Sequence, residues 1–298
     1  MKRKKRERLF FYSFISPWII GFLLFSVIPM VTSIYYSFTK ITVLGLGRKD
    51  PVWVGFKNYV DLFADSDFIG SIGTTFAYSF LRVFIGVFLS LMVALLVNKD
   101  IYFKKLFRTL IYLPAIIPVV GSAIIWSQLF SSDFSLLNYL LSIIGIPPIN
   151  WLSYDNSFWS VLFMSLWCGI GPTMIIIVSA LQNVPKELLE AAEIDGAGPV
   201  RRFGMIVVPL ISSTLLYNLV TGFISTLQAY AEMDLLTGGF GNTETMAMNV
   251  VNNAFSDDGG GLGYACAQAW IIFVIILIFT LLFFKITTKN IYYAGDDK

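Results

Sequence analysis

The sequence predicts an all-α integral membrane protein with six transmembrane helices, and three observations support this fold class. Of the 298 residues, 56% are hydrophobic and only 13% are charged, whereas soluble domains carry about 25% charged residues. Six apolar stretches are long enough to cross a hydrocarbon core of about 30 Å, which needs about 20 helical residues. The sequence does not show the series of segments of about ten residues, alternating apolar and polar, that is typical of a β-barrel. Each stretch is therefore expected to be a helix, because a helix satisfies its own backbone hydrogen bonds in lipid.

The spans follow one another along a single predicted transmembrane domain, residues 1–298, without an internal repeat or a second soluble domain. We expect the spans at about residues 10–36, 72–97, 106–130, 158–181, 206–230 and 264–284. Several prolines lie in or near them, and we expect these prolines to kink the helices rather than to break them. They are Pro17, Pro29, Pro114, Pro118, Pro172 and Pro209.

A basic run, Lys2 to Arg6 with Arg8, precedes the first apolar stretch. Because no small-x-small cleavage site follows a short apolar core, we interpret this stretch as a retained first span with a basic anchor and not as a signal peptide.

Three polar segments separate spans on the opposite side of the membrane. In the segment 39–71, Asn58, Tyr59, Leu62 and Phe63 indicate a short interfacial helix. The segment 131–156 is expected to hold a second interfacial helix at 136–144, followed by the Trp151-Leu152 pair. The glycines of the segment 231–263 indicate a loop.

Lysine and arginine are distributed unequally between the two sides. Sixteen of the 21 lie on the side of the two termini and of the segment 182–205, four lie on the other side, and Arg82 lies within a span. The positive-inside rule therefore places both termini and the segment 182–205 in the cytoplasm.

Several function classes are disfavoured by what the sequence lacks. There is no histidine, which argues against His-ligated zinc or haem and against a Ser-His-Asp triad. No Gly-Lys dipeptide is present, so a Walker A loop is not expected. We therefore expect no metal site, no cofactor site and no membrane enzyme. The net charge of +2 is too small to indicate nucleic-acid binding, and Cys168 and Cys266 are expected to be small apolar fillers.

The segment 182–205 is predicted to form two short helices on the cytoplasmic side. Pro185 suits the first helical position, Asp195-Gly196 would end the first helix, and Gly198-Pro199 would begin the second. Glutamates recur every three residues on one side of the first helix, with apolar residues on another. The glutamates are Glu187, Glu190 and Glu193. This pattern fits a helix lying on lipid headgroups and a helix docking a soluble partner equally well.

The same segment carries Glu190-Ala191-Ala192, then Gly196 after three residues, Ile206 after nine more, and Val208-Pro209 after one more. This spacing resembles the coupling loop, often called the EAA loop, of permease subunits of binding-protein-dependent ABC importers. Val208 stands where that family usually has leucine. The run Thr237-Gly238-Gly239 is similar to one found after the fifth span in maltose-type carbohydrate permeases, although Phe240-Gly241 replaces the usual Gly-Pro.

The resemblance implies a type I ABC importer permease of the carbohydrate-uptake branch, in a bacterial cytoplasmic membrane. Such a subunit would pair with a second homologous permease and with two ABC ATPase subunits, which bind ATP and Mg. An extracytoplasmic binding protein would deliver a sugar or oligosaccharide. The resemblance also implies that the ATPase contact is made by Glu187, Glu190, Ala191, Ala192, Asp195 and Gly196. One alternative keeps this architecture but imports a non-sugar solute such as glycerol-phosphate or a polyamine. Another is a stand-alone secondary transporter. Ion coupling in such transporters usually relies on carboxylates buried in the spans, and the inner spans here hold no unambiguous one.

Polar residues recur at spacings of three and four in the fifth predicted span, which would place them on one helix face. They are Asn218, Thr221, Ser225, Gln228 and Glu232, and Thr226 and Tyr230 would supplement them. One interpretation is a face that lines the path of a hydroxyl-rich sugar. The other is a set of hydrogen bonds between neighbouring helices. Similarity to the maltose permease places sugar contacts near Thr226 and Gln228.

Arg82 is the one clear charge in the middle of a predicted span. An arginine at the bilayer centre costs at least roughly 2.5–3.5 kcal/mol on insertion scales, so we expect it to face protein or water. Structural pairing, with Glu232 or with a group on another subunit, is favoured over contact with substrate.

Overall fold

The computed structural model describes residues 2–41, 50–99, 102–131, 135–255 and 261–287. The chain forms two compact units, Met1–Phe68 with Val250–Phe273, and Ile69–Asn249 with Val274–Lys298. The α-helices among the described residues are α1 (Lys2–Phe22), α2 (Ile28–Ser37), α3 (Lys57–Ala64), α4 (Ser66–Asn98), α5 (Lys104–Tyr112), α6 (Val119–Leu129), α7 (Leu136–Ile143), α8 (Ser157–Gln182), α9 (Lys186–Ile194), α10 (Pro199–Arg202), α11 (Val208–Thr226), α12 (Ala231–Thr237), α13 (Met246–Ala254) and α14 (Gly261–Thr287). Two π-helical turns (Leu23–Val27 and Phe203–Val207), one 3₁₀ turn (Leu113–Ile116) and the strands β1 (Thr39–Lys40) and β2 (Val52–Trp53) complete the described elements.

Within the first unit, a short antiparallel strand pair follows the first span. In it Thr39 of β1 lies opposite Trp53 of β2. The side-chain amide of Asn58, on α3, donates hydrogen bonds to the carbonyls of Ser37 at 2.8 Å and of Thr39 at 2.9 Å. α3 is the short helix expected in this segment, and Asn58 fastens it to the strand because its buried amide has both donors satisfied.

The first apolar span, Phe10–Ser37, consists of α1 and α2 joined by a π-helical turn. Its large hydrophobic side chains stay accessible within this chain, as in Phe14 (84% exposed) and Phe25 (81%). A helix can remain in lipid in this way because its backbone groups bond within the helix.

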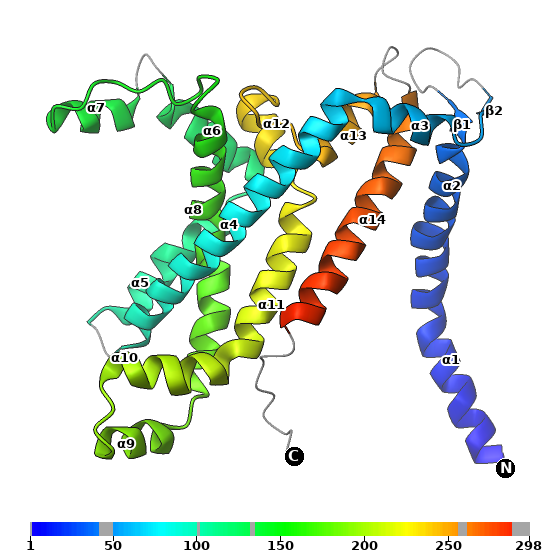
Figure 1. Cartoon of the computed structure of the whole chain (residues 1–298). Coiled ribbons are helices and arrows are strands. Elements are labelled where there is room, and N and C mark those ends of the chain that lie inside the picture. Colours follow the sequence, from blue (N-terminus) through cyan, green and yellow to red (C-terminus); the bar gives the residue numbers. More distant parts are fainter. Residues whose placement is uncertain (1, 42–49, 100–101, 132–134, 256–260, 288–298) are drawn as a thin grey trace. The chain divides into compact units, whose positions relative to one another are not determined.

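The second unit is built around α4, α8 and α11, which pack against one another. The hydroxyl of Ser90 on α4 donates to the carbonyl of Ile170 on α8 at 3.1 Å, and a side chain added at Gly222 of α11 would meet Val83 of α4 at 3.3 Å. In this unit, α9 and α10 lie at one end of these long helices, and α7 and α12 lie at the other (Figure 1).

Five helical segments among the described residues are long and apolar enough to cross a membrane, and a bent pair would make a sixth if it forms one span. The bent pair covers the predicted third span, where α5 and α6 meet at 98°. The expectation that prolines only kink the spans is wrong here. Pro118 has no N–H to donate, and the residue before it, Ile117, is extended (φ −73°, ψ 126°), so the helix stops and a new one begins.

The other prolines behave differently from one another. Pro17 and Pro172 lie inside continuous helices, as expected. Pro29 and Pro209 each follow a π-helical turn and occupy the first turn of the next helix. In a π-helical turn the backbone N–H groups donate to the carbonyl at i−5 instead of i−4. This shift lets the helix continue past a proline, which has no N–H to donate.

Two hydrophobic clusters hold the second unit together at two levels of α8. The cluster toward the α7 end includes Trp126, Val161 and Met164, all buried. The cluster toward the α9 end includes Ala94 and Ile177, also buried.

The segment 231–263, predicted as a loop, contains α12 and α13. Glycine does end α12, since Gly238 (φ +61°) and Gly239 (φ +86°) adopt left-handed conformations that residues with a Cβ disfavour. Residues 256–260 of this segment lie outside the described residues.

Candidate functional site

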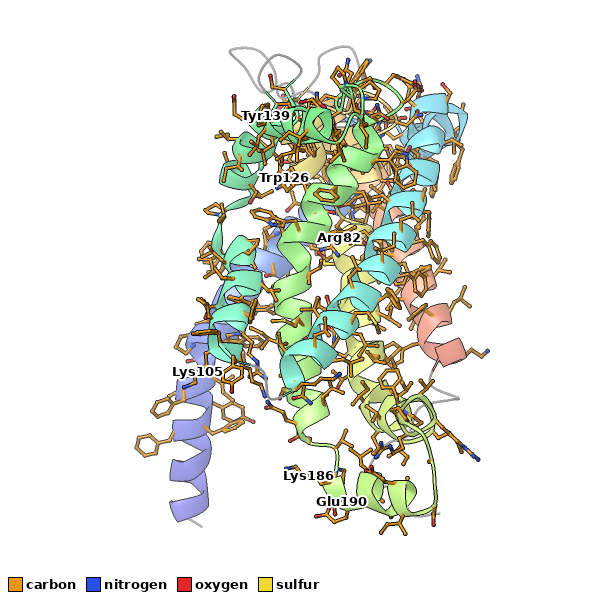
Figure 2. All side chains as sticks on the ribbon, turned by 90° about the vertical axis from the view of Figure 1, so that its left-hand side faces the viewer. Arg82, Lys105, Trp126, Tyr139, Lys186 and Glu190 are labelled. Carbon is orange, nitrogen blue, oxygen red and sulfur yellow. The ribbon has the colours of Figure 1, made fainter. Side chains whose placement is uncertain are left out.

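A polar cavity of about 320 Å³ lies inside the second unit. α8 contributes Met164, Ser165, Cys168, Gly169 and Pro172 to its lining. Figure 2 shows Arg82 about halfway along the long helices, between α4 and α8. The cavity combines two charged side chains, Arg82 and Glu232, with five hydroxyl groups. These hydroxyls belong to Tyr78, Ser122, Ser165, Ser225 and Thr226.

Backbone features contribute to the lining of this cavity. On α8, Gly169 has no side chain and Pro172 follows it in the lining. The break between α5 and α6 adds Pro114 and Ile117 to the lining. Polar and charged side chains in the middle of membrane-spanning helices usually line a substrate path or bind a ligand.

The two charged residues of the cavity are held differently. Tyr78, one helical turn before Arg82 on α4, donates its phenol hydrogen to Oε1 of Glu232 at 3.2 Å. Among the described residues, no carboxylate oxygen lies within 4.0 Å of the Arg82 guanidinium. The Arg82–Glu232 ion pair considered from the sequence is therefore not formed in this structure, while pairing with another subunit stays a prediction.

Glycines on two helices make room for the Arg82 guanidinium. A Cβ placed on Gly86 would lie 2.5 Å from Nη1, and a Cβ placed on Gly169 would lie 2.7 Å from Cζ and closer still to Nη2. The guanidinium thus occupies the space that side chains at these two positions would take.

The predicted polar stripe of the fifth span is divided in the structure. α11 ends at Thr226, so Gln228 lies in the following turn and Glu232 lies in α12. Only the end of the stripe reaches the cavity, through Ser225 and Glu232, together with the supplementary Thr226. The single helix face expected from spacing is wrong beyond Thr226, because the chain turns there with Gln228 N–H donating to the Ser225 carbonyl at 3.2 Å.

The remaining residues of the stripe bond locally. The Asn218 amide donates to the carbonyl of residue 214 at 2.8 Å, the Thr221 hydroxyl to that of residue 217 at 2.7 Å, and the Gln228 amide to that of residue 224 at 2.8 Å. Tyr230, beyond the end of the span, donates its phenol hydrogen to Asp234 at 3.0 Å. That hydrogen bond raises the pKa of the Tyr230 phenol, since the proton is shared with a carboxylate.

Several cavity residues were not predicted from the sequence. Tyr78 was predictable in principle, because it lies four positions before Arg82 and therefore shares its helix face. Ser122, Ser165 and Cys168 were not predictable, since single small polar residues in different spans are common and only packing brings them together.

The predicted two-helix segment is present as α9 and α10, at the end of the second unit opposite α7. Figure 2 shows Glu190 at this end and Tyr139 of α7 at the other. The first helix begins one residue later than predicted. Pro185 is extended (φ −60°, ψ 128°) and precedes the helix, which starts at Lys186.

The end of α9 is a Schellman motif. The N–H of Gly196 donates to the Glu193 carbonyl at 3.0 Å, and the N–H of Ala197 donates to the Ala192 carbonyl at 2.9 Å. Gly196 adopts φ +77°, and among the described residues other than its two chain neighbours no heavy atom lies within 4 Å of where its Cβ would be. Glycine is therefore needed for backbone conformation and not for space.

α9 buries no residue against the rest of the chain. Glu187, Glu190, Ala191 and Asp195 are exposed, and Ala192 is half-buried. Apolar side chains are exposed nearby, including Ile194 (87%) and Val200 (83%) on the two sides of the turn. An ion pair, Arg202 Nη1 to Glu193 Oε2 at 2.5 Å, links α9 to α10. The segment is thus an ordered, unburied surface that combines acidic and apolar groups.

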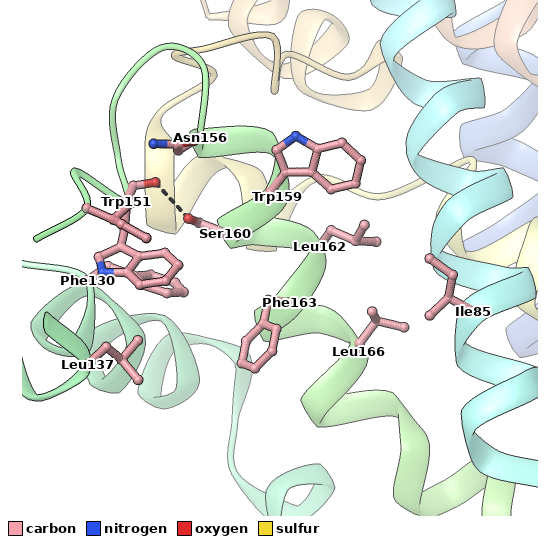
Figure 3. Close-up of a pocket in the computed structure, with 11 residues that line it drawn as sticks. Ile85, Phe130, Leu137, Trp151, Asn156, Trp159, Ser160, Leu162, Phe163 and Leu166 are labelled. Carbon is pink, nitrogen blue, oxygen red and sulfur yellow. Dashed lines mark hydrogen bonds between the residues drawn. The ribbon is translucent and has the colours of Figure 1, made fainter. Parts of the chain in front are cut away.

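A larger cavity of about 470 Å³ lies at the α7 end of α8, and it is apolar. Figure 3 shows Phe130, Trp151, Trp159 and Phe163 around it. The hydroxyl of Ser160, one of its few polar groups, donates to the Trp151 carbonyl at 2.7 Å and is already satisfied. This cavity offers little to a hydroxyl-rich solute, so the polar cavity is the candidate solute site.

Residues 86–290 match the family described as binding-protein-dependent transport system inner membrane component, and the chain belongs to this family. It is therefore a transport permease subunit of the ABC importer class and not an enzyme.

The relatives share this class. The chain is 33% identical to the probable ABC transporter permease protein YesP of Bacillus subtilis, over 99% of this chain and 95% of the relative. It is 28% identical to the trehalose/maltose transport system permease protein MalF of Thermococcus litoralis, over 96% of each chain. A bacterial ABC transporter involved in import of the acidic polysaccharide alginate contains a chain with a TM-score of 0.82, at 25% identity over 97% of this chain and 98% of that one. The predicted type I importer permease fold is confirmed.

Proposed function

We propose that this chain forms half of the translocation pathway of an ATP-driven importer for a sugar or oligosaccharide. The polar cavity halfway along the long helices is the observation that carries this proposal, because a solute that crosses a membrane needs polar partners at mid-depth. Relatives support the solute class, since they include permeases for starch degradation products and for trehalose and maltose.

The proposed complex contains a second, homologous permease, two ABC ATPase subunits and an extracytoplasmic binding protein. ATP and Mg would be bound by the ATPases, and this chain would carry neither. The excess of lysine and arginine supports a cytoplasmic location for α9, α10 and both termini, in a bacterial cytoplasmic membrane.

α9 is the proposed contact with an ATPase. Its acidic positions Glu187, Glu190 and Asp195 and the small Ala191 are exposed, and Ala192 lies among them. Because no side chain of α9 is buried within this chain, its exposed face is available to pack into a groove of another protein. The ion pair and the Gly196 turn tie α9 to α10, which continues through a π-helical turn into α11. Movement of α9 by the ATPases would thereby reach α11, whose far end lines the cavity.

The solute contacts proposed on α11 and beyond are Asn218, Thr221, Ser225, Thr226, Gln228 and Tyr230. Ser225 and Thr226 are the best supported, because both line the polar cavity. We expect Thr226→Ala with Gln228→Ala to reduce uptake while the complex still assembles. Unchanged transport kinetics in this double variant would remove these two residues from the path.

The proposal is tested by reconstituting the complete complex in proteoliposomes with the binding protein on one face. Uptake of radiolabelled oligosaccharides should require ATP on the α9 face and should not follow an imposed ion gradient. Uptake driven by the ion gradient without ATP would instead support a secondary transporter.

A phosphorylated solute is the second candidate. The sn-glycerol-3-phosphate permease UgpA of Yersinia pestis is 31% identical over 95% of each chain, and the cavity holds a cation, Arg82. The same proteoliposomes, offered labelled glycerol 3-phosphate, distinguish the two candidates.

A further inference from the structure

The cavity contains a cation, Arg82, that forms no ion pair with any residue the structure describes. Arg82 is half-buried on α4 and lines the cavity. Within the part of the chain that the structure describes, its guanidinium makes no hydrogen bond within 3.5 Å and no ion pair within 4.0 Å. An arginine presents a planar fork of donors and stays charged, so it pairs best with a carboxylate or a phosphate.

The guanidinium lies in space that two glycines leave open. Gly86, one turn further along α4, and Gly169, on α8, leave the space that its two terminal nitrogens occupy. A long basic side chain in a span otherwise tends to extend toward the membrane surface. Here the two glycines form a slot that leaves room for the fork at the level of the cavity.

The acidic group of the cavity is engaged elsewhere. Glu232 accepts the phenol hydrogen of Tyr78 at 3.2 Å and lies beyond ion-pair distance of Arg82. The cavity thus separates a cation from a hydrogen-bonded acid, with the hydroxyls of Ser165 and Ser225 also in its lining. A ligand matching this arrangement has an oxyanion at one end and hydroxyl groups along its length, the latter suited to the carboxylate and the serines.

We propose that the translocated solute is an anionic carbohydrate whose oxyanion pairs with Arg82 at mid-path. This rests on the proposed function, because it assigns the solute class of the same cavity. A carboxylate on a uronic acid residue and a phosphate ester share the required chemistry, and Arg82 supplies the cationic half of the ion pair with either.

The test uses the intact importer complex in lipid nanodiscs, with the binding protein omitted so that only the permease cavity selects. Three probes are titrated: an alginate trisaccharide, the same trisaccharide with its carboxyl groups reduced to alcohols, and glycerol 3-phosphate. We expect an anionic probe to bind about tenfold or more tightly than the reduced trisaccharide, since a charge-assisted pair is lost in the latter. Binding should also weaken as salt is added.

Two variants locate the effect, and a third serves as a control. Arg82→Gln should abolish the preference for the anionic probe, while Arg82→Lys, which retains the charge but not the fork, should preserve part of it. Lys105→Gln removes one positive charge from an exposed position on α5 that does not line the cavity, and it should leave the preference unchanged.

The outcomes separate the possibilities. Preference for the trisaccharide supports a uronate-type solute, and preference for glycerol 3-phosphate supports a phosphate ester at the same site. Absence of any Arg82-dependent preference overturns the anion assignment. If Arg82→Gln then imports a neutral oligosaccharide in proteoliposomes at the wild-type rate and with ATP dependence, the proposed function stands and only the solute class is wrong.

Discussion

Gly169 and Gly171 lie two residues apart on α8, and the structure predicts different consequences for the same substitution at each. A Cβ at Gly171 would lie 2.6 Å from the Ile111 carbonyl oxygen and 2.8 Å from the Tyr112 Cα, both backbone atoms of α5. A Cβ at Gly169 would meet the end of the Arg82 side chain, which can rotate away. Gly171→Ala must therefore move one helix backbone from another, whereas Gly169→Ala moves only a guanidinium.

The comparison of the two variants isolates this packing effect. Both replacements gain the same helix propensity, about 0.5–1 kcal/mol, so propensity cancels between them. Overpacking against atoms that cannot rotate typically costs about 1–3 kcal/mol. We expect Gly171→Ala to be less stable than Gly169→Ala by about that amount, roughly a factor of 5 to 150 in the unfolding equilibrium.

The assay is thermal unfolding of the detergent-purified complex followed by tryptophan fluorescence, with wild type and both variants run in parallel. Gly169→Ala should unfold near the wild-type temperature, and Gly171→Ala clearly below it. If the two variants unfold together, or if Gly169→Ala is the weaker one, the close approach of α5 and α8 is not what these glycines serve. Gly169→Ala should also lower the affinity for an anionic probe, because it displaces the guanidinium from its slot.

Three further predictions concern single residues. Gly196→Thr forces a β-branched residue into φ +77° at a cost of about 1–2 kcal/mol, and it should uncouple ATP hydrolysis from uptake. Gly198→Thr, at φ −65°, is the control and should keep hydrolysis and uptake coupled. Fully coupled transport in Gly196→Thr would count against α9 as the element that transmits ATPase movement. Glu193→Gln should cost less than about 1 kcal/mol, because the carboxylate that pairs with Arg202 is 67% exposed, and a double-mutant cycle that gives a much larger coupling energy would contradict this. Asn138→Leu should destabilise the folded protein by about 1–3 kcal/mol for each polar group left unpaired. The buried amide oxygen of Asn138 accepts hydrogen bonds from the Ile149 backbone N–H and the Trp151 indole N–H. Unchanged thermal stability would show that water replaces the amide.

Elements that depend on local sequence were predicted closely. Helices long and apolar enough to cross a membrane lie within a few residues of the first, second, fourth and sixth predicted ranges, apart from the start of α4 at Ser66. A helix also lies around Glu190, where the residue spacing predicted it. The third span departed most, since two prolines four residues apart ended one helix and began another at 98°. How far a proline bends a helix depends on what satisfies the freed carbonyls, and the neighbouring helices decide that.

The sequence by itself determined that this protein crosses a membrane as helices and that it contains a segment with the spacing of the family's coupling loop. The reason is that lipid imposes a long apolar stretch on every span, and that the motif is a continuous run of residues. Only the tertiary structure decided which polar groups share a cavity, because Tyr78, Ser122, Ser165 and Glu232 come from four different helices. Pairing within the membrane was likewise decided by packing. The Arg82 guanidinium lies in a slot left by glycines on α4 and α8, beyond ion-pair distance of Glu232, the partner that the sequence suggested.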